Sequence, residues 1–202
     1  LLGIVDDKEN DATTESAEIT NSTSVMMTTV QGNDNAIGYV SLGSLSDSVK
    51  EVTVDGVEGT AENVKSGKYK ISRPFNLCYY DGKLSKLAED LINFIMSDEG
   101  QKTVDKEGYI SVESGKSYKA SGLKGKITVA GSTSVAPLMN VIADEYKKLN
   151  PGVTIEIQES GSTAGIQSAT EKAVDIGMSS RELKDDEAKT LATKKIAMDG
   201  IA

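Results

Sequence analysis

Residues 126–138 read Lys-Ile-Thr-Val-Ala-Gly-Ser-Thr-Ser-Val-Ala-Pro-Leu, a short apolar stretch that runs into a loop of glycine and hydroxyl residues. The apolar half predicts a strand, and apolar residues then recur at helical spacing as far as Leu149. Thr133 or Ser134 can cap that helix, and Pro137 is tolerated in its first turn. The stretch therefore predicts a strand, a polar loop and a helix in direct succession.

The same kind of junction occurs twice more downstream. Residues 160–165 read Ser-Gly-Ser-Thr-Ala-Gly after a predicted strand at 153–158, and residues 179–182 read Ser-Ser-Arg-Glu after one at 174–178. Strands joined by short helical connections predict a parallel sheet with right-handed crossovers. The other elements expected in this half are helices at 162–173 and 182–193 and a strand at 195–202.

Three polar loops at the carboxyl ends of parallel strands predict a site for a small anion. These ends meet in the crevice where ligands bind to α/β sheets. Unpaired backbone N–H groups at the helix starts favour an anion there. Ordinary helix capping uses the same residue types, however, so spacing alone leaves both interpretations open.

The composition limits the classes of function. The 202 residues suffice for one large domain or two small lobes, and a net charge of −9 argues against a nucleic-acid partner. The absence of histidine excludes Ser-His-Asp and Cys-His catalysis. Cys78 is expected to be a buried apolar side chain, and no cofactor is implied. A solvated acidic loop, rather than a calcium site, is expected from Asp6, Asp7, Glu9, Asp11 and Glu15.

The first half of the chain is less regular. Residues 36–42 and 49–54 predict strands, and residues 71–80 read as extended. Leucine and isoleucine at helical spacing predict an amphipathic helix at 84–95. Residues 111–126 are small, polar and rich in glycine, which is the composition of an exposed linker.

Several motifs that occur together cover most of the chain. They lie at residues 37–42, 73–75, 94–101, 127–137, 160–165 and 175–183. In combination they resemble the phosphate-binding proteins of bacterial ABC transporters. The resemblance implies a type II periplasmic-binding-protein fold, an α/β parallel sheet flanked by helices, with the first lobe nearly complete and the second partial.

The order of these motifs differs from that of the family, whose Gly-Ser-Thr-Ser strand lies near the N-terminus. The resemblance implies a circular permutation, with 111–125 as the linker that joins the family's original termini. Residues 1–70 then form a partial second lobe, 71–110 the C-terminal part of the first lobe, and 126–202 its N-terminal part with the anion-binding loops. Arg-Pro-Phe at 73–75 is expected to pack at the lobe junction rather than to contact the ligand. The family's Ser-Gly-Thr-Arg loop is absent, so we expect a truncated second lobe and weakened phosphate binding.

The resemblance also implies which residues bind phosphate. They are Thr133, Ser134, Ser162 and Ser180, together with Gly131, Ser132, Gly161, Thr163 and Arg181. Many relatives carry an aspartate at or near Ser180, where it accepts a proton from monohydrogen phosphate; serine accepts more weakly. Arg181 can instead form a salt bridge with Glu182 or Asp185, and Gly131 can serve the turn rather than the ligand.

The function implied is capture of inorganic phosphate, or of sulfate as a mimic, for an ABC importer, without catalysis. The natural partner is an ABC permease, and the parent family is extracytoplasmic, although no signal peptide is seen here. A homo-oligomer is also expected, through strand edges exposed around 37–42 and 196–202. Two alternatives remain open: an engineered or truncated flavodoxin-like scaffold with no ligand, and an enzyme acting on a phosphorylated substrate. No histidine, phosphate-binding Gly-Lys loop or metal cluster supports the enzyme.

Overall fold

The computed structural model describes residues 13–202, so the expectation for Asp6, Asp7, Glu9 and Asp11 lies outside the described residues. The strands are β1 Ser72–Tyr80, β2 Ile110–Ser111, β3 Gly125–Gly131, β4 Val153–Glu159, β5 Ile176–Ser179 and β6 Leu191–Gly200. The α-helices are α1 Thr23–Gln31, α2 Ala61–Lys65, α3 Lys86–Ile95, α4 Asp98–Lys106, α5 Ala136–Leu149 and α6 Ser162–Thr170. Two single 3-10 turns, η1 and η2, lie at Leu42–Ser44 and Glu187–Lys189. No helix of the described part is long and apolar enough to cross a membrane.

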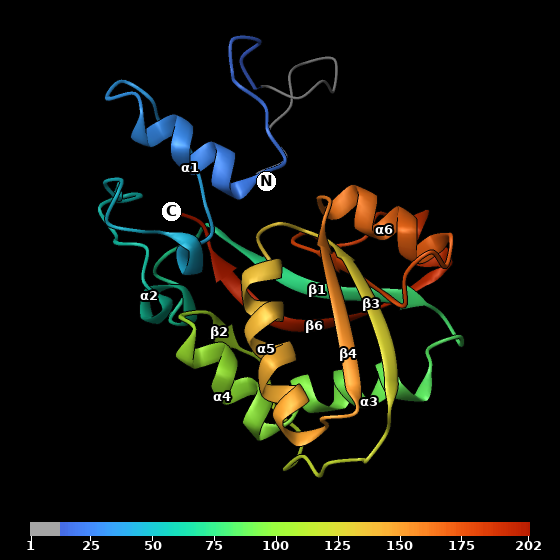
Figure 1. The fold of residues 1–202 in the computed structure, drawn as a ribbon. Helices are drawn as coiled ribbons and strands as arrows, with labels where there is room; N and C mark the ends of the chain where they lie inside the picture. The colour runs from blue at the N-terminus through green and yellow to red at the C-terminus, as the bar shows by residue number, and fades with distance from the viewer. Residues whose placement is uncertain (1–12) are drawn as a thin grey trace.

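The strands form one sheet in the order β2-β6-β1-β5-β3-β4, with helices packed against it (Figure 1). β3 pairs with both β4 and β5 in parallel, as expected. β1 lies between β5 and β6 and is antiparallel to both, so the sheet is mixed rather than wholly parallel. β3, β4, β5 and β6 consequently point the same way, and their carboxyl ends meet at one edge beside the start of β1.

The core lies on both faces of β1, because its side chains alternate between them. Phe75 and Leu77 are fully buried in the larger cluster, which also includes apolar residues of α3 and α5. Cys78 faces the other way and packs with Ile166 of α6. Cys78 is fully buried, so the expectation of a buried apolar side chain is confirmed, and this burial raises the pKa of its thiol to about 12.

Three expectations for secondary structure are wrong. Residues 36–42 and 49–54 are not strands: within the described residues, Ser41 bridges only Ile201 and Val54 only Val57. A strand forms where a neighbour completes its hydrogen-bond ladder, and these segments have only a one-residue bridge each. Residues 182–190 are a loop with one 3-10 turn, and residues 191–193 belong to β6, which begins at Leu191 because that residue pairs with Tyr80 at the end of β1.

The segments expected to leave exposed edges cover each other in part. Val40 donates its N–H to Ala202, and Ala202 donates back to Val40, both at 2.9 Å. Ile196 is fully buried, whereas Ile37 remains 85% exposed. Figure 1 shows the C-terminus beside this N-terminal part of the chain, below α1.

The linker at 111–125 is largely exposed, as expected, but Tyr118 near its centre packs against the body of the protein. Tyr118 donates its N–H to Glu99 at 2.8 Å and its hydroxyl to Asp90 at 2.6 Å. Its ring meets Phe94 edge to face, with 5.1 Å between the centroids. One aromatic residue therefore anchors an otherwise polar connection to α3 and α4.

Candidate functional site

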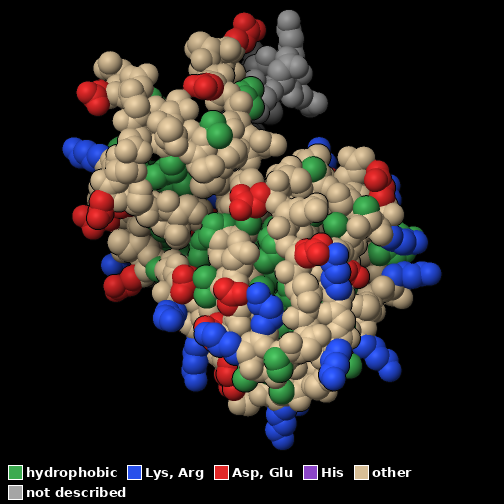
Figure 2. All heavy atoms as spheres, in the orientation of Figure 1, with side chains coloured by type: hydrophobic (Ala, Val, Ile, Leu, Met, Phe, Trp, Pro, Cys, Tyr) green, Lys and Arg blue, Asp and Glu red, His purple; other side chains and the backbone are tan. Residues whose placement is uncertain are grey.

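A cleft of about 610 Å³ lies where the carboxyl ends of the parallel strands face the N-terminal segment. Its floor is made of the polar loops that precede α5 and α6 and the end of β5, and its roof of residues 13–26 and the start of α1. In Figure 2 this N-terminal part rises above the rest of the body, and few Lys or Arg side chains are visible on it. The expected site residues that line the cleft are Ser132, Thr133, Ser134, Gly161, Ser162 and Ser180.

The loop before α5 leaves its hydroxyl groups free of capping. The helix begins at Ala136 after Val135, and no side chain caps it, so the expectation that Thr133 or Ser134 caps α5 is wrong. Ser132 closes the turn instead, because its carbonyl accepts from the N–H groups of Val135 and Ala136. Within the described residues, the N–H groups of Thr133 and Ser134 have no protein acceptor.

The start of α6 is arranged in the same way. Its N-cap is Gly161, at φ +86°, and no side chain caps this helix either. The N–H groups of Ser162, Thr163 and Ala164 find no acceptor among the residues described. Five backbone donors from two helix starts are thus unpaired at one edge of the sheet, which favours a negative charge there.

Two serines form the inner wall of the cleft. The hydroxyl oxygens of Ser162 and Ser180 lie 3.2 Å apart, and the Ser180 N–H donates to Ser162 Oγ at 3.1 Å. This contact joins the start of α6 to the end of β5. Both serines are partly buried, so a ligand that reaches them meets hydroxyl groups already fixed in place.

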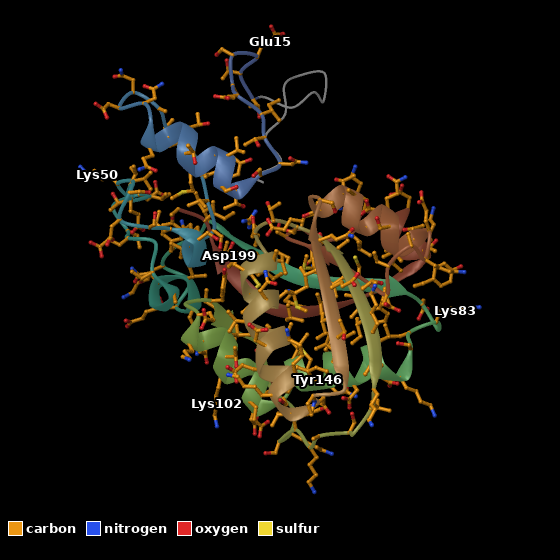
Figure 3. All side chains as sticks on the ribbon, viewed as in Figure 1. Glu15, Lys50, Lys83, Lys102, Tyr146 and Asp199 are labelled. Carbon is orange, nitrogen blue, oxygen red and sulfur yellow. The ribbon has the colours of Figure 1, made fainter. Side chains whose placement is uncertain are left out.

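Arg73 also lines the cleft, although the sequence pattern placed the Arg-Pro-Phe segment at the lobe junction. Its Nε donates to Asp199 at 3.1 Å, and its Nη1 donates to Ser180 Oγ at 3.4 Å. Figure 3 labels Asp199 at the middle of the molecule, below α1. Burial raises the pKa of the Asp199 carboxyl, while Arg73 and a hydrogen bond from Ser41 act in the opposite direction.

The roof contacts the floor through hydroxyl groups. Thr133 donates its hydroxyl to the carbonyl of Asn21 at 3.0 Å, and its oxygen lies 3.1 Å from that of Thr23. Thr23 is the first residue of α1, whose N-cap Ser22 accepts from Val25. A third helix start therefore faces the cleft from the opposite side.

Three expected site residues lie elsewhere. Arg181 forms a bidentate salt bridge with Glu187, rather than with Glu182 or Asp185. Its Nη1 and Nη2 donate to Oε2 and Oε1 of Glu187, each at 2.8 Å. Gly131 serves packing, since a Cβ there would lie 2.2 Å from the carbonyl oxygen of Met178. The Thr163 side chain is not among those that line the cleft, and only its backbone N–H belongs to the donor set.

Comparisons with known proteins identify the family to which the chain belongs. Residues 116–202 match the family described as PBP superfamily domain. The chain is 49% identical over 193 residues to the phosphate-binding protein PstS 2 of Streptococcus agalactiae serotype V, covering 95% of this chain and 66% of that protein. It is 48% identical over 197 residues to PstS 2 of Streptococcus pneumoniae serotype 4, covering 97% and 67%.

A solved structure shows the same fold. It is a phosphate-binding protein of a phosphate ABC transporter from Streptococcus pneumoniae TIGR4, with a TM-score of 0.75 and 48% identity over 93% of this chain and 73% of that one. The fold and the cleft define a binding protein of the periplasmic type, built on an α/β sheet flanked by helices. The chain belongs to the PstS family of phosphate-binding proteins, and it spans about two thirds of the length of the curated relatives it matches.

Proposed function

We propose that this chain binds inorganic phosphate as the solute receptor of an ABC importer, and that it binds without catalysis. One observation carries the proposal: the hydroxyl groups at the starts of α5 and α6 are not used for capping. Capping was the competing interpretation of these residue types. Without capping, the backbone N–H donors of both helix starts and the Ser162 hydroxyl remain at one cleft, whereas the Thr133 hydroxyl donates to Asn21. The names of the relatives indicate phosphate as the anion.

Phosphate-dependent chemical shift changes in the 1H–15N spectrum of the chain test the proposal. Inorganic phosphate is added at constant ionic strength, with chloride as the control anion. We expect saturable shifts at the N–H groups of Thr133, Ser134 and Ser162. Saturable binding elsewhere, or no binding below about 100 mM, would contradict the proposal.

The affinity of the 202-residue chain by itself is expected to be low. Each exposed helix start contributes about 0.3–1 kcal/mol to anion binding, and each hydrogen bond adds about 1 kcal/mol. Two or three terms of each kind correspond to a dissociation constant nearer millimolar than micromolar. The net charge of −9 opposes the approach of an anion, and salt screens that repulsion.

We propose that the chain carries a circular permutation relative to the family order described above, with residues 111–125 joining the original termini, and that its two streptococcal relatives share this permuted order. β1, from the first half of the chain, lies between β5 and β6 from the second half, so both halves build one lobe. The matches to the two streptococcal proteins run through 95% and 97% of the chain and must pass through the linker. This supports a natural order shared with those relatives, and the engineered scaffold is not favoured.

The partners in this proposal are phosphate, or sulfate as its mimic, and an ABC permease, with the chain acting outside the cytoplasm. A homo-oligomer remains a separate proposal. It rests on the exposed side chains of Ile37 and Tyr39, which are 85% and 62% exposed. The pairing of Val40 with Ala202 covers part of the edge expected to associate, which weakens the case. Molar mass measured over a range of concentrations tests it.

A further inference from the structure

We propose that Arg73 is the cationic ligand of the anion site and that it orients the hydroxyl group of Ser180 as a donor. The inference rests on the proposed function and adds a residue to it. Among the described residues that line the cleft, Arg73 is the single Lys or Arg side chain. It comes from β1, in the first half of the chain, whereas Ser162 and Ser180 come from the second half.

The guanidinium of Arg73 is fixed in position by Asp199 and Phe75. Asp199 is fully buried and accepts from Arg73 Nε on one oxygen and from Ser41 Oγ at 2.7 Å on the other. The ring of Phe75 lies below, with its centroid 5.8 Å from Arg73 Cζ. The Arg73 side chain is 14% exposed. Because these contacts fix the long side chain before a ligand arrives, binding loses little rotamer entropy.

Hydrogen-bond donors of Arg73 remain available. A guanidinium carries five N–H groups in a planar fork. Arg73 uses one on Asp199 and one on Ser180, and the other three have no acceptor within the part of the chain that the structure describes. A partly buried guanidinium with unpaired donors beside a cleft suits a tetrahedral oxyanion, which offers two oxygens to such a fork.

The hydrogen bond from Arg73 also sets the direction of the Ser180 hydroxyl proton. Ser180 Oγ accepts from Arg73, and Ser162 Oγ accepts from the Ser180 N–H. Each oxygen is already an acceptor, so each hydroxyl has a proton to donate toward the other serine or toward a ligand. Arg73 and the two serines together present hydrogen-bond donors to an anion. The anion oxygen that contacts them is therefore expected to carry no proton.

Among residues 13–202, no other charged side chain near the cleft replaces Arg73. Arg181 follows Ser180 directly in the sequence, but its guanidinium forms a salt bridge with Glu187. Glu15 and Glu18 line the cleft from the N-terminal segment, where they oppose an anion rather than attract one. Figure 3 shows Glu15 at the far end of that segment, away from Asp199. The attraction of the site for an anion therefore depends on Arg73 and on backbone dipoles.

The test measures phosphate affinity by 1H–15N titration of the 202-residue chain and of Arg73→Gln, Arg73→Lys and Arg181→Gln. We expect Arg73→Gln to raise the dissociation constant about tenfold or more, because it removes a charge-assisted contact. Arg73→Lys keeps the charge and should recover part of the loss. Arg181→Gln is the matched control and should stay within about twofold of the wild type. The affinity of Arg73→Gln should also depend less on salt, which a purely structural role would not produce.

A fold defect is separated from a binding defect by a second variant. Arg73→Gln leaves Asp199 buried without its cation, so the double variant with Asp199→Asn places a neutral amide pair there instead. If either folded variant binds phosphate within about twofold of the wild type, the role of Arg73 is overturned while the proposed function stands. If the wild type binds no oxyanion at all, both are overturned.

Discussion

Gly165 in α6 packs directly against Gly131 at the end of β3: a Cβ on Gly165 would lie 2.5 Å from the Cα of Gly131. The carbonyl of Gly131 accepts the N–H groups of Ser160 and Gly161 at 2.9 and 2.8 Å. Two glycines thereby bring the start of α6 against the strand that ends at the other anion-binding loop. The missing side chain of Gly165 lets α6 approach β3, whereas the missing side chain of Gly131 leaves room for the backbone of Met178 in β5.

Gly165→Ala tests this packing. The added methyl meets the backbone of β3, which cannot move aside, so we expect destabilisation of about 1–3 kcal/mol and weaker phosphate binding. Urea denaturation measures the first effect and the 1H–15N titration the second. Gly115→Ala is the control, because its nearest neighbour would be a carbonyl oxygen 3.9 Å away. Equal stability of both variants would contradict the account.

Ser162→Ala and Thr133→Ala should each weaken phosphate binding about three- to tenfold, the value of one hydrogen bond of about 1 kcal/mol. Ser162→Ala also removes the acceptor of the Ser180 N–H. Thr133→Ser keeps the hydroxyl and should bind like the wild type. Calorimetric or NMR titration of the three variants measures their dissociation constants for phosphate. If neither alanine substitution changes the dissociation constant, the ligand binds elsewhere.

Ser180→Asp should make the site discriminate between phosphate and sulfate. Wild-type Ser180 and Ser162 meet the ligand as hydroxyl donors, so both anions should bind with similar affinity. A carboxylate at 180 accepts the proton of monohydrogen phosphate and repels sulfate, which carries no proton at neutral pH. We expect the phosphate-to-sulfate affinity ratio to rise about tenfold or more, the change that 1.4 kcal/mol produces. Competition titrations with the two anions measure the ratio.

The salt bridge between Arg181 and Glu187 should make stability depend on acid pH. Hydrogen bonds from Arg181 lower the pKa of Glu187 to about 2, below its ordinary value of 4.5. The ionised carboxylate therefore stabilises the fold fully above pH 4.5, and this contribution is lost as the pH falls through 2. Melting temperatures from pH 6 to pH 2 should fall less steeply in Glu187→Gln than in the wild type. Parallel curves for the two proteins would refute this.

The anchor of the linker predicts a pattern of amide exchange. The Tyr118 N–H donates to Glu99, and this bond with one from Ser117 lowers the pKa of Glu99 to about 2. We expect protection at Tyr118 and rapid exchange at residues 119–124, which are largely exposed. Glu99→Ala should remove the protection at Tyr118, while Glu113→Ala in the same connection should not. Strong protection throughout 114–125 would contradict an exposed connection.

Local sequence patterns predicted the second half of the fold well. The strand at 125–131, the helix at 136–149 and the strand at 153–159 follow from apolar spacing and turn residues, which act over short distances. The helix expected at 182–193 failed because its outcome depends on a distant partner. Residues Leu191 to Thr193 extend a strand paired with β1, and nothing near them in the sequence reports that pairing.

The candidate site was predictable to the same extent. Hydroxyl residues at the strand ends come together as the parallel order requires, and Thr133, Ser162 and Ser180 line one cleft. Arg73 was missed because its place depends on the insertion of β1 between β5 and β6. The sequence signal that could have indicated Arg73 is Asp199, which precedes Gly200 at the end of the last strand. A carboxylate buried there requires a cationic partner, and Arg73 is that partner.

The central position of β1 has a consequence for synthesis. Asn76 of β1 donates to the carbonyl of Arg181, 105 residues later in the chain. A ribosome therefore delivers an apolar strand, with Phe75 and Leu77 uncovered, long before the strands that flank it exist. Pairing at such sequence distance is slow to form and leaves strand edges open to other chains. The growing polypeptide must keep β1 unpaired until β5 and β6 have emerged, so the strand that supplies Arg73 to the cleft is also open to aggregation during translation.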